Sequence, residues 1–468
     1  MASSRKSPKN NALPARIAAV LKQHVQRDDR LVVGLSGGID SVVLLDLLHR
    51  AARSLRFSLA AVHVNHQLSP SANAWAKFCR VLCREYAIPL TVKKVSLKPG
   101  NSLEASARKA RYAVYAAQRC DAIVLAHNQD DQVETLLLQL LRGTGVKGAS
   151  AMAEYRNHDS GIRIQHDQGA GKLNPESRIL NPAVIRPLLD VPRSEIAAYA
   201  KKRKLVWIED DSNANTAFDR NFVRHRVLPV IAERFPAYRH TLSRASRNFS
   251  EAAALIDAFA AADIAIADGV LDLAPLRALS AVRVKNALRY FLSFHGVLMP
   301  SARRLEECAR QLMRGGAAAR TKIVLGVHEL RRYGDQLHVV AVSAAAPGRL
   351  PAVHWRGEKQ LDLPQFGGTL IMRAVRGRGI RLAGIAHKPV TLRGREGGEK
   401  LQPDPRRPRR TLKNLWQELR IPEWQRSRQP LLYVGDDLVY VAGLGIDARF
   451  QAAAGEAGIA PDWHPDAA

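Results

Sequence analysis

The chain has 468 residues, enough for two to four domains, and 46% of them are hydrophobic, which excludes wholesale disorder. Lysine and arginine number 71 against 43 acidic residues, and the net charge of +28 favours a polyanionic partner such as a nucleic acid over a generally basic proteome. No run of eighteen apolar residues and no apolar signal-peptide core occur, so we expect a cytoplasmic protein that does not enter a membrane.

Up to about residue 230, short β-branched runs alternate with amphipathic stretches. This pattern predicts strands at 31–35, 59–66, 90–97 and 122–128, and helices at 72–87 and 102–120. Such alternation indicates a parallel sheet with helices on both faces. We therefore predict an α/β, doubly wound domain over residues 1–235, which binds its ligands beyond the carboxyl ends of the strands.

The composition changes along the rest of the chain. Residues 155–182 are polar, rich in turn formers and without periodicity, so we expect a long loop or insertion there, for which no role follows. Residues 236–345 have helical spacing and predict a helical domain, and residues 343–352 have the composition of a linker. Short strand-like runs return in residues 353–468, which predicts a small α+β domain.

The cysteines bear on the redox state and on metal binding. The chain has four, at Cys79, Cys83, Cys120 and Cys308. They form no CxxC pair and no metal-finger spacing, so we expect reduced thiols in the core.

One loop has a phosphate-binding pattern. In the sequence LVVGLSGGIDSVVLLDLL, a strand-like run ends in Ser36, Gly37 and Gly38, and the chain restarts as a helix. The glycines let the backbone approach an anion closely, the hydroxyls of Ser36 and Ser41 add donors, and a helix N-terminus favours negative charge. Asp40 would repel a phosphate unless a cation lies between them, and Mg²⁺ is the usual choice. A plain turn with a helix cap is the alternative.

The loop is not a Walker A motif, because no G-x4-G-K-[ST] occurs in the chain. SGGIDS resembles the pyrophosphate loop of the ATP-pyrophosphatase (PP-loop) superfamily, whose members split ATP between the α- and β-phosphates. The resemblance implies that ATP is bound by Ser36, Gly37, Gly38, Ile39, Asp40 and Ser41. GTGVKG (143–148) also fits GxGxxG, but it follows a helical run, so we expect a helix end and a loop there.

Further stretches resemble the tRNA(Ile)-lysidine synthetase family. They are VHVNHQLSPSANAWAKFC, NSLEASARKARY, LAHNQDDQVETLLLQLLRGTGVKG and RPLLDVPRSEIAAYA with the following WIEDDSNANTAFDRNFVRHRVLP; LRGREGGEKL and RRTLKNLWQELRIPEWQRSRQPLLY resemble the family's C-terminal domain. The resemblance implies a ligase that joins free L-lysine to C2 of the wobble cytidine of a tRNA(Ile) with a CAU anticodon. The reaction passes through an adenylated cytidine and releases AMP and pyrophosphate. ATP and Mg²⁺ are the implied cofactors, no protein partner is evident, and a homodimer is left open.

Acidic residues follow the fourth predicted strand. The resemblance implies a metal bound by Asp40 and Asp131, and catalytic roles for Asp40, His127, Asp130, Asp131 and Glu134. Asp130 and Glu134 are four residues apart and share a helix face, where carboxylates could hold Mg²⁺, bind the lysine ammonium or act as a base. An acidic first turn that only complements the helix dipole is the alternative. The family usually has a second histidine where this chain has Asn128, which leaves the role of that position open.

Two further groups are candidates for substrate contact. Glu104, Arg108 and Arg111 fall on one helical face, and the resemblance implies contacts to lysine or cytidine. A solvated Glu–Arg pair is the structural alternative. His63, near the end of the second predicted strand, lies where the superfamily seats adenosine, although a packed histidine is as common at such a place.

Basic residues indicate contacts to tRNA. The stretch DRNFVRHR resembles an RNxxR element of the family, and residues 373–428 hold sixteen Lys or Arg against five Asp or Glu. We expect contacts to the tRNA backbone by Arg220, Asn221, Arg224, Arg393, Arg395, Arg409, Arg410 and Lys413. Two alternatives remain for the whole chain. One is a tRNA-thiolating enzyme, which typically carries CxxC pairs, and the other is a nucleotide-sensing RNA-binding protein without catalysis.

Overall fold

The computed structural model describes residues 13–96, 103–157, 182–209, 215–314, 320–342, 350–385 and 388–465, with the backbone alone for residues 103–105. The chain divides into two compact units, Met1–Asp263 with Arg289–Gly296 and Ile264–Leu288 with Val297–Ala468. Within the described part of the chain, no helix is long and apolar enough to cross a membrane. Most of the expected insertion at 155–182 and of the expected linker at 343–352 lies outside the described residues.

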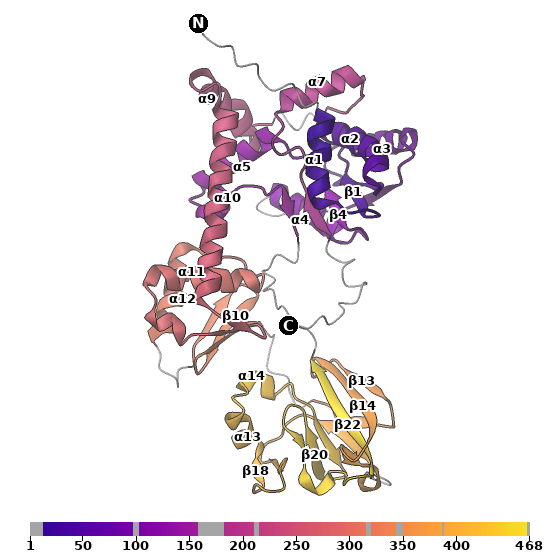
Figure 1. The fold of residues 1–468 in the computed structure, drawn as a ribbon, viewed down its shortest axis with the longest axis vertical. Coiled ribbons are helices and arrows are strands. Elements are labelled where there is room, and N and C mark those ends of the chain that lie inside the picture. Colours follow the sequence, from indigo (N-terminus) through magenta and orange to yellow (C-terminus); the bar gives the residue numbers. More distant parts are fainter. Residues whose placement is uncertain are drawn as a thin grey trace. The chain divides into compact units, whose positions relative to one another are not determined.

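A six-stranded sheet forms the centre of the first unit (Figure 1). Its strand order is β3-β2-β1-β4-β6-β5, in which the first five strands run parallel and β5 pairs antiparallel with β6. The strands are β1 (Arg30–Gly34), β2 (Ser58–Asn65), β3 (Leu90–Lys94), β4 (Ala122–Val124), β5 (Tyr155–Arg156) and β6 (Ala183–Ile185). The four strands predicted from the sequence are confirmed, apart from their exact ends.

Helices cover both faces of this sheet. The helices of the first unit are α1 (Leu13–His24), α2 (Ile39–Leu55), α3 (Ala72–Glu85), α4 (Leu103–Ala116), α5 (Gln129–Leu141), α6 (Val146–Ala149), α7 (Arg193–Arg203), α8 (Asp219–Phe222), a π-helical turn (Val223–Val227), α9 (Leu228–Arg234) and α10 (Tyr238–Asp263). Leu31 and Val33 of β1 face a core formed with α1, α2, α3 and α7, whereas Val32 faces a second core with Tyr115 of α4. This alternation is the period of two expected of a strand that is buried on both sides, and it confirms the doubly wound arrangement.

Two smaller sequence predictions are also confirmed. All four cysteines are free and buried. GTGVKG follows the end of α5, and Gly143 has a φ of 68°, as expected of a glycine just past a helix C-terminus, although residues 146–148 form part of the short helix α6 and not a loop.

The strand order places a topological switch point between β1 and β4. From β1 the chain continues to β2 on one side, and β4 lies on the other side of β1. The loops that leave the carboxyl ends of β1 and β4 therefore diverge and leave a crevice, where ligands bind in open α/β sheets. These two loops hold SGGIDS and residues 125–128.

The second unit begins with an antiparallel sheet and helices. Its strands, in the order β7-β8-β11-β10-β9, are β7 (Ile266–Ala267), β8 (Val270–Asp272), β9 (Lys322–Leu325), β10 (His328–Tyr333) and β11 (Gln336–Ala341). A 3-10 turn (Pro275–Ala278) and α12 (Ala302–Arg314) belong to the same part, and α11 (Ala281–Phe294) runs through the boundary between the units. The prediction of a helical region at 236–345 was thus incomplete, because it missed this sheet. In β9 buried and exposed residues alternate, and Ile323 and Leu325 are the buried ones.

The C-terminal part of the chain consists of two packed sheets and short helices. One sheet has the order β12-β16-β19-β20-β21 and another β13-β14-β22-β15; β17 and β18 form a ribbon. The elements are β12 (Val353–Trp355), β13 (Gln360–Leu363), β14 (Gly368–Arg376), β15 (Ile380–Arg381), β16 (Val390–Arg393), β17 (Lys400–Leu401), β18 (Arg410–Thr411), α13 (Leu412–Glu418), α14 (Glu423–Arg426), β19 (Leu431–Val434), β20 (Asp437–Val441), β21 (Gly445–Ile446) and β22 (Ala457–Pro465), with 3-10 turns at Leu382–Gly384 and Ala448–Phe450. Leu370 of β14 and Leu432 of β19 come from the two larger sheets and are buried in the same hydrophobic core. Trp416 of α13 packs with Leu431 and Leu438 in a further cluster.

Candidate active site

The SGGIDS loop (residues 36–41) joins β1 to the first turn of α2. Gly37 has a φ of 93°, and a Cβ at this position would come within 2.9 Å of Ile208 Cδ1. The amide of Gly37 donates to Ser41 Oγ (3.1 Å), and Ser41 Oγ donates to the carbonyl of Gly38 (2.9 Å). The loop is thereby closed on itself at the start of a helix, where unpaired backbone amides favour an anion.

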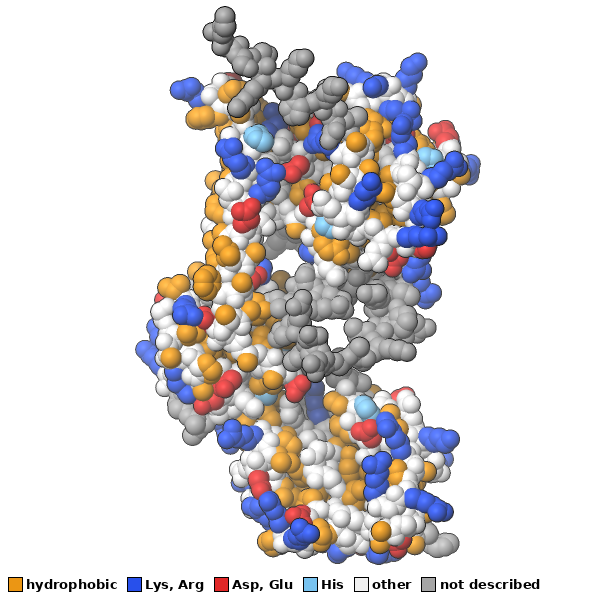
Figure 2. Space-filling view, in the orientation of Figure 1, with side chains coloured by type: hydrophobic (Ala, Val, Ile, Leu, Met, Phe, Trp, Pro, Cys, Tyr) orange, Lys and Arg blue, Asp and Glu red, His pale blue; other side chains and the backbone are white. Residues whose placement is uncertain are grey.

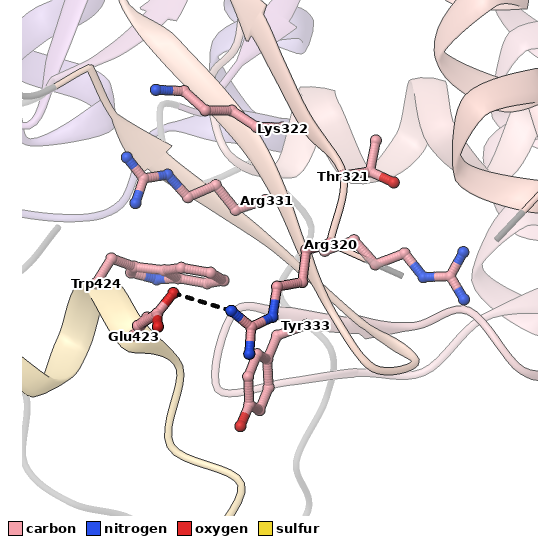
Figure 3. Close-up of a pocket in the computed structure, with 8 residues that line it drawn as sticks. Arg320, Thr321, Lys322, Arg331, Tyr333, Glu423 and Trp424 are labelled. Carbon is pink, nitrogen blue, oxygen red and sulfur yellow. Dashed lines mark hydrogen bonds and ion pairs between the residues drawn. The ribbon is translucent and has the colours of Figure 1, made fainter. Parts of the chain in front are cut away.

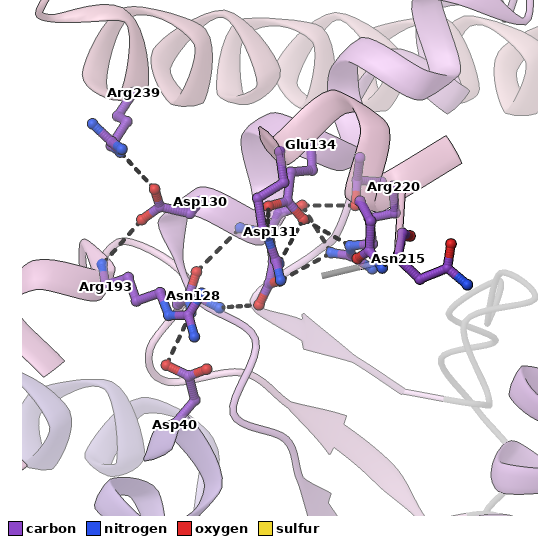
Figure 4. A network of polar contacts seen from close by, with 12 residues as sticks. Asp40, Asn128, Asp130, Asp131, Glu134, Arg193, Asn215, Arg220 and Arg239 are labelled. Atoms are coloured by element: carbon purple, nitrogen blue, oxygen red, sulfur yellow. Dashed lines mark hydrogen bonds and ion pairs between the residues drawn. The ribbon is translucent and has the colours of Figure 1, made fainter. Parts of the chain in front are cut away.

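Asp40 lies in the first turn of α2 and faces α5 across the crevice (Figure 4). Asn128 Nδ2 donates a 3.1 Å hydrogen bond to Asp40 Oδ1. Burial raises the pKa of Asp40 to about 6, the negative charge of Asp131 adds to the rise, and Arg193 and the Asn128 bond oppose it. The pKa of Asp40 thus lies close to neutral pH, and its carboxylate accepts a hydrogen bond from an uncharged group.

A capping box begins α5. Asn128 Oδ1 accepts from the amide of Asp131 (3.1 Å), and Asp131 Oδ2 accepts from the amide of Asn128 (3.0 Å). This reciprocal pair stabilises the first turn of the helix. Asn128 therefore has two structural tasks in this chain: it caps α5 and it binds Asp40.

Glu134 and Asp131 are engaged by two arginines. Glu134 is fully buried, and it accepts from Arg220 Nε (2.7 Å) and Arg224 Nε (2.6 Å). Asp131 Oδ1 accepts from Nη2 of Arg220 (3.1 Å) and of Arg224 (3.4 Å). Burial disfavours the charged guanidinium groups, but the two carboxylates outweigh it and raise the pKa of both arginines. In this arrangement Arg220 and Arg224 face the carboxylates of α5.

Asp130 connects α5 to α7 and α10. Its Oδ2 accepts from the backbone amide of Arg193 (3.0 Å), the first residue of α7, and its Oδ1 accepts from Arg239 Nε (2.5 Å). The predicted carboxylates thus lie in one region, but their surroundings differ. Asp130 accepts from an arginine side chain and a backbone amide, and Glu134 accepts from two arginine side chains. Asp40 accepts instead from the uncharged side-chain amide of Asn128.

Three histidines lie near the ends of β2 and β4. Burial lowers the pKa of His127 to about 3, and its Nδ1 is buried and has no hydrogen-bond partner among the described residues. His63 is buried, and its Nδ1 donates to the carbonyl of Leu35 (2.9 Å). Burial also lowers the pKa of His66, to about 4, and both of its ring nitrogens are buried without a partner in the part of the chain that the structure describes. Near pH 7 all three are neutral rings that can exchange single hydrogen bonds with a ligand.

Arg186, just after β6, is a site residue that the sequence analysis missed. It is 4% exposed, and its Nη1 donates to the carbonyl of Ala153 (2.7 Å) and its Nη2 to Tyr112 Oη (3.4 Å). Arg186 Nε is buried, and no described residue provides a hydrogen-bond partner for it. Burial raises the pKa of Tyr112, but the charges of Arg186 and Arg108 contribute to an overall lowering of that pKa. The same two arginines also lower the pKa of His127, more weakly than burial does. The signal was an arginine directly after a buried strand, at the same edge as the other loops.

The two predicted arginines of α4 are exposed. The Arg108 guanidinium lies 5.1 Å from the centre of the Tyr112 ring, and Arg111 contributes to the lowered pKa of His66. Both are therefore near the histidines at the carboxyl edge of the sheet. The side chain of Glu104 lies outside the described residues.

The predicted tRNA contacts of the C-terminal part are partly engaged within the protein. Arg393 donates to Thr391 Oγ1 (2.9 Å), Arg395 lies over the Trp416 ring, and Arg409 and Arg410 pair with Asp447 and Glu418. Lys413 is exposed and has no partner among the described residues, and Asn221 Nδ2 donates to the carbonyl of Asn215. Figure 2 shows Lys and Arg side chains spread over the visible face of both units.

Two pockets lie near charged side chains in the described part of the chain. One, of about 460 Å³, is lined in part by Asp130, Arg224, Tyr238 and Arg239 of the first unit. The other, of about 250 Å³, lies in the second unit (Figure 3). There the Arg331 guanidinium lies 5.3 Å from the Trp424 ring centre and Arg320 pairs with Glu423 (3.3 Å). The first of these pockets adjoins the carboxylates of α5.

The donor set fits Mg²⁺ held largely by substrate phosphates. Mg²⁺ usually takes one or two protein carboxylates and keeps its other ligands from water and phosphate. Asp40 offers such a carboxylate beside the loop, whereas both oxygens of Asp131 already accept hydrogen bonds. No group of three or more His, Cys, Asp or Glu placed to hold a metal occurs among the described residues. An all-protein metal site is therefore not supported there.

Comparison with known proteins assigns the chain to a family. A PP-loop domain model matches residues 10–231, a TilS substrate binding domain model matches 271–338, and a TilS substrate C-terminal domain model matches 390–463. The chain is 40% identical to the tRNA(Ile)-lysidine synthase of Nitrosomonas europaea over 449 residues, which cover 95% of this chain and 94% of that protein. It is 38% identical to the tRNA(Ile)-lysidine synthase of Coxiella burnetii, with 90% of each chain covered. The chain belongs to the tRNA(Ile)-lysidine synthase family.

Proposed function

We propose that this chain joins free L-lysine to C2 of the wobble cytidine of a tRNA(Ile) with a CAU anticodon, at the expense of ATP. One observation carries the proposal. A phosphate-binding loop stands at the switch point of the sheet, opposite the acidic first turn of α5, in a chain that matches the family along nearly its whole length.

In the first step the C2 oxygen of cytidine attacks the α-phosphorus of ATP. The bond between that phosphorus and the oxygen that bridges to the β-phosphorus breaks, and pyrophosphate leaves. Ser36 and the N-terminus of α2 are the groups that hold the pyrophosphate part, and the glycines at 37 and 38 let the backbone approach it closely. Mg²⁺, bound by Asp40 and the phosphates, would neutralise charge on the leaving group. His63, beside the loop at the end of β2, is the candidate contact for adenosine.

In the second step the ε-amine of lysine attacks C2 and AMP leaves with the former C2 oxygen. The amine must first lose a proton, because its ordinary pKa is about 10.4. Asp40, with a pKa raised to about 6, is better matched to this task than a carboxylate bound by arginines. We therefore assign Asp40 as the base, and Glu134 as a positioning residue.

Besides its ε-amine, free lysine carries a positive α-ammonium group and a negative α-carboxylate, so its binding site needs both acidic and basic side chains. The pocket of about 460 Å³ offers Asp130 and Glu134 together with Arg224 and Arg239. Arg108 and Arg111 on α4 are the candidates for cytidine or its phosphate. The tRNA body would contact Lys413 and the arginines of the C-terminal part, and because the substrate is a tRNA, we place the reaction in the cytoplasm.

The test is pyrophosphate release by the full-length protein with ATP, Mg²⁺ and a tRNA(Ile) transcript that bears CAU. Release should depend on the transcript, and Asp40→Ala should abolish it. A transcript with a changed wobble base is the matched control and should give no release. Release that is independent of tRNA would contradict the proposed substrate, and the absence of release with any tRNA would favour an RNA-binding protein without catalysis.

A further inference from the structure

Arg193, the first residue of α7, carries an unpaired cation toward the SGGIDS loop. Within the described residues its guanidinium forms no hydrogen bond or ion pair, and only its backbone amide is engaged, by Asp130. Figure 4 shows its side chain extending from α7 toward Asn128 and Asp40. Its positive charge also opposes the rise in the pKa of Asp40, as expected of a neighbour.

The arginines around it differ in this respect. Arg220 and Arg224 are bound to Glu134 and Asp131, and Arg239 is bound to Asp130. Arg193 is exposed, so its guanidinium is free to bind an anion from solvent. A guanidinium binds phosphate oxygens in pairs through its planar fork.

The start of α7 is fixed next to the crevice. Besides the Asp130 contact, the carbonyl of Val191 accepts from the amide of Gln129 (3.0 Å), which ties the segment before α7 to α5. Arg16 of α1 donates to Glu195 (2.8 Å) in the first turn of α7. Arg193 is thus placed by several contacts that do not involve its own side chain.

The other end of α7 is anchored to the helix that begins at the loop. Asp46 of α2 is 1% exposed and accepts from Tyr199 Oη (2.6 Å) and Arg203 Nη2 (3.1 Å), both on α7. Beyond α7, the amide of Ile208 donates to the carbonyl of Gly37 (2.9 Å). Helices α2 and α7 and the loop are therefore joined, and the position of Arg193 relative to the loop is set by the fold.

We propose that Arg193 binds the β- and γ-phosphates of ATP, and the pyrophosphate formed from them, from the side of the crevice that faces the SGGIDS loop. When the bond from the α-phosphorus to the bridging oxygen breaks, negative charge grows on the departing pyrophosphate. A guanidinium already in place stabilises that charge without reorganisation. Arg193 would then contribute to binding of ATP and to the rate of adenylation. This inference rests on the proposed function in one respect, namely that ATP is split between its α- and β-phosphates.

The test measures binding of three probes to the full-length protein by calorimetry: pyrophosphate, α,β-methylene-ATP and AMP, each with Mg²⁺. Arg193→Ala should weaken the first two about tenfold or more and leave AMP within about twofold. Arg193→Lys should lie between the wild type and Arg193→Ala. Lys202→Ala is the matched control, because it removes the same charge from the same helix about 13 Å further along.

Unchanged binding of pyrophosphate to Arg193→Ala would overturn the proposal. An equal loss for AMP would also overturn it, because it would mean a general change of the site, and so would an equal loss in Lys202→Ala, which would mean a non-specific effect of charge. The proposed function is tested separately by lysidine formation in the wild type. Its failure would leave these binding results standing.

Discussion

The side-chain amide of Asn128 donates a 3.1 Å hydrogen bond to Asp40 and joins the first turns of α2 and α5. The same side chain caps α5 through the amide of Asp131. An asparagine here supplies a neutral donor to Asp40, and because its amide does not titrate, the charge of the donor does not change with pH in the physiological range.

Replacement of Asn128 by aspartate should separate its two tasks. Asn128→Asp keeps an N-cap acceptor for α5, but it removes the donor and places a second negative charge beside Asp40. The affinity for ATP with Mg²⁺ should fall about tenfold at neutral pH, because repulsion between the two carboxylates shifts the pKa of Asp40 further upward. Asn128→Ser, which keeps a cap without a charge, is the control. Equal nucleotide affinity in the two variants would contradict the role of charge at this position.

Asp40→Asn should stabilise the protein in the absence of metal while abolishing activity. The pKa of Asp40 is about 6 in the folded protein, against the ordinary value of 3.8 for an aspartate side chain. A raised pKa contributes stability that is present below the unfolded value and is lost as the pH rises through about 6. The uncharged variant avoids this loss, on the order of 1 to 3 kcal/mol, at pH 7.5. Denaturant unfolding with a chelator should therefore show a gap between the two proteins that narrows from pH 7.5 to pH 5; a constant or absent gap would argue against a raised pKa.

Gly37 and Gly38 should respond differently to alanine. Gly37 has a positive φ and a blocked Cβ position, whereas Gly38 has a φ of −72° and its nearest neighbour would lie at 3.6 Å. Gly37→Ala should lower the free energy of unfolding by about 1 kcal/mol or more, and Gly38→Ala by less. Thermal unfolding of both variants measures this difference. Equal stability would mean that the loop relaxes freely around position 37.

Glu134→Gln should act mainly on stability. The carboxylate is fully buried and bound by Arg220 and Arg224, so its loss leaves two partly buried cations with one partner fewer. The expected cost is about 3 kcal/mol of unfolding free energy. Asp219→Asn, which breaks an exposed pair with Arg142, should cost little. A variant of wild-type stability that has lost turnover would instead assign Glu134 a direct part in catalysis.

Substitutions of Lys413 and Arg393 should have different effects on tRNA affinity and on the melting temperature. Lys413 is exposed and unpaired among the described residues, while Arg393 bonds Thr391 and the carbonyl of Gly435 and lies over Tyr433. Lys413→Ala should reduce the salt dependence of tRNA binding by about one counterion and leave the melting temperature unchanged. Arg393→Ala should lower both affinity and melting temperature. Anisotropy titrations with labelled tRNA over a salt series distinguish these cases; an unaltered salt slope in Lys413→Ala would remove that residue from the interface.

Local patterns in the sequence were enough to predict the catalytic core. Hydrophobic runs between turn formers gave four of the parallel strands, and SGGIDS gave the loop, because strand period and glycine geometry act over a few residues. The short strands β5 and β6 and the sheet of the second unit were missed. Two or three residues of β5 or β6 carry too little periodicity to stand out.

The site was only partly predictable for a different reason. The sequence grouped Asp130, Asp131 and Glu134 but did not separate their surroundings. Their partners, Arg239, Arg220 and Arg224, are 86 to 109 residues away in the chain. Long-range pairing of this kind has no local signal, and neither has the burial of Arg186.

The most direct test of the central claim is the mass of the wobble nucleoside after reaction. The full-length protein is incubated with ATP, Mg²⁺, free lysine and a tRNA(Ile) transcript bearing CAU, and the digested tRNA is analysed by mass spectrometry. Our account predicts a cytidine heavier by one lysine less one water, formed only when lysine is present. An unmodified cytidine, or one with a sulfur-sized change, would contradict it.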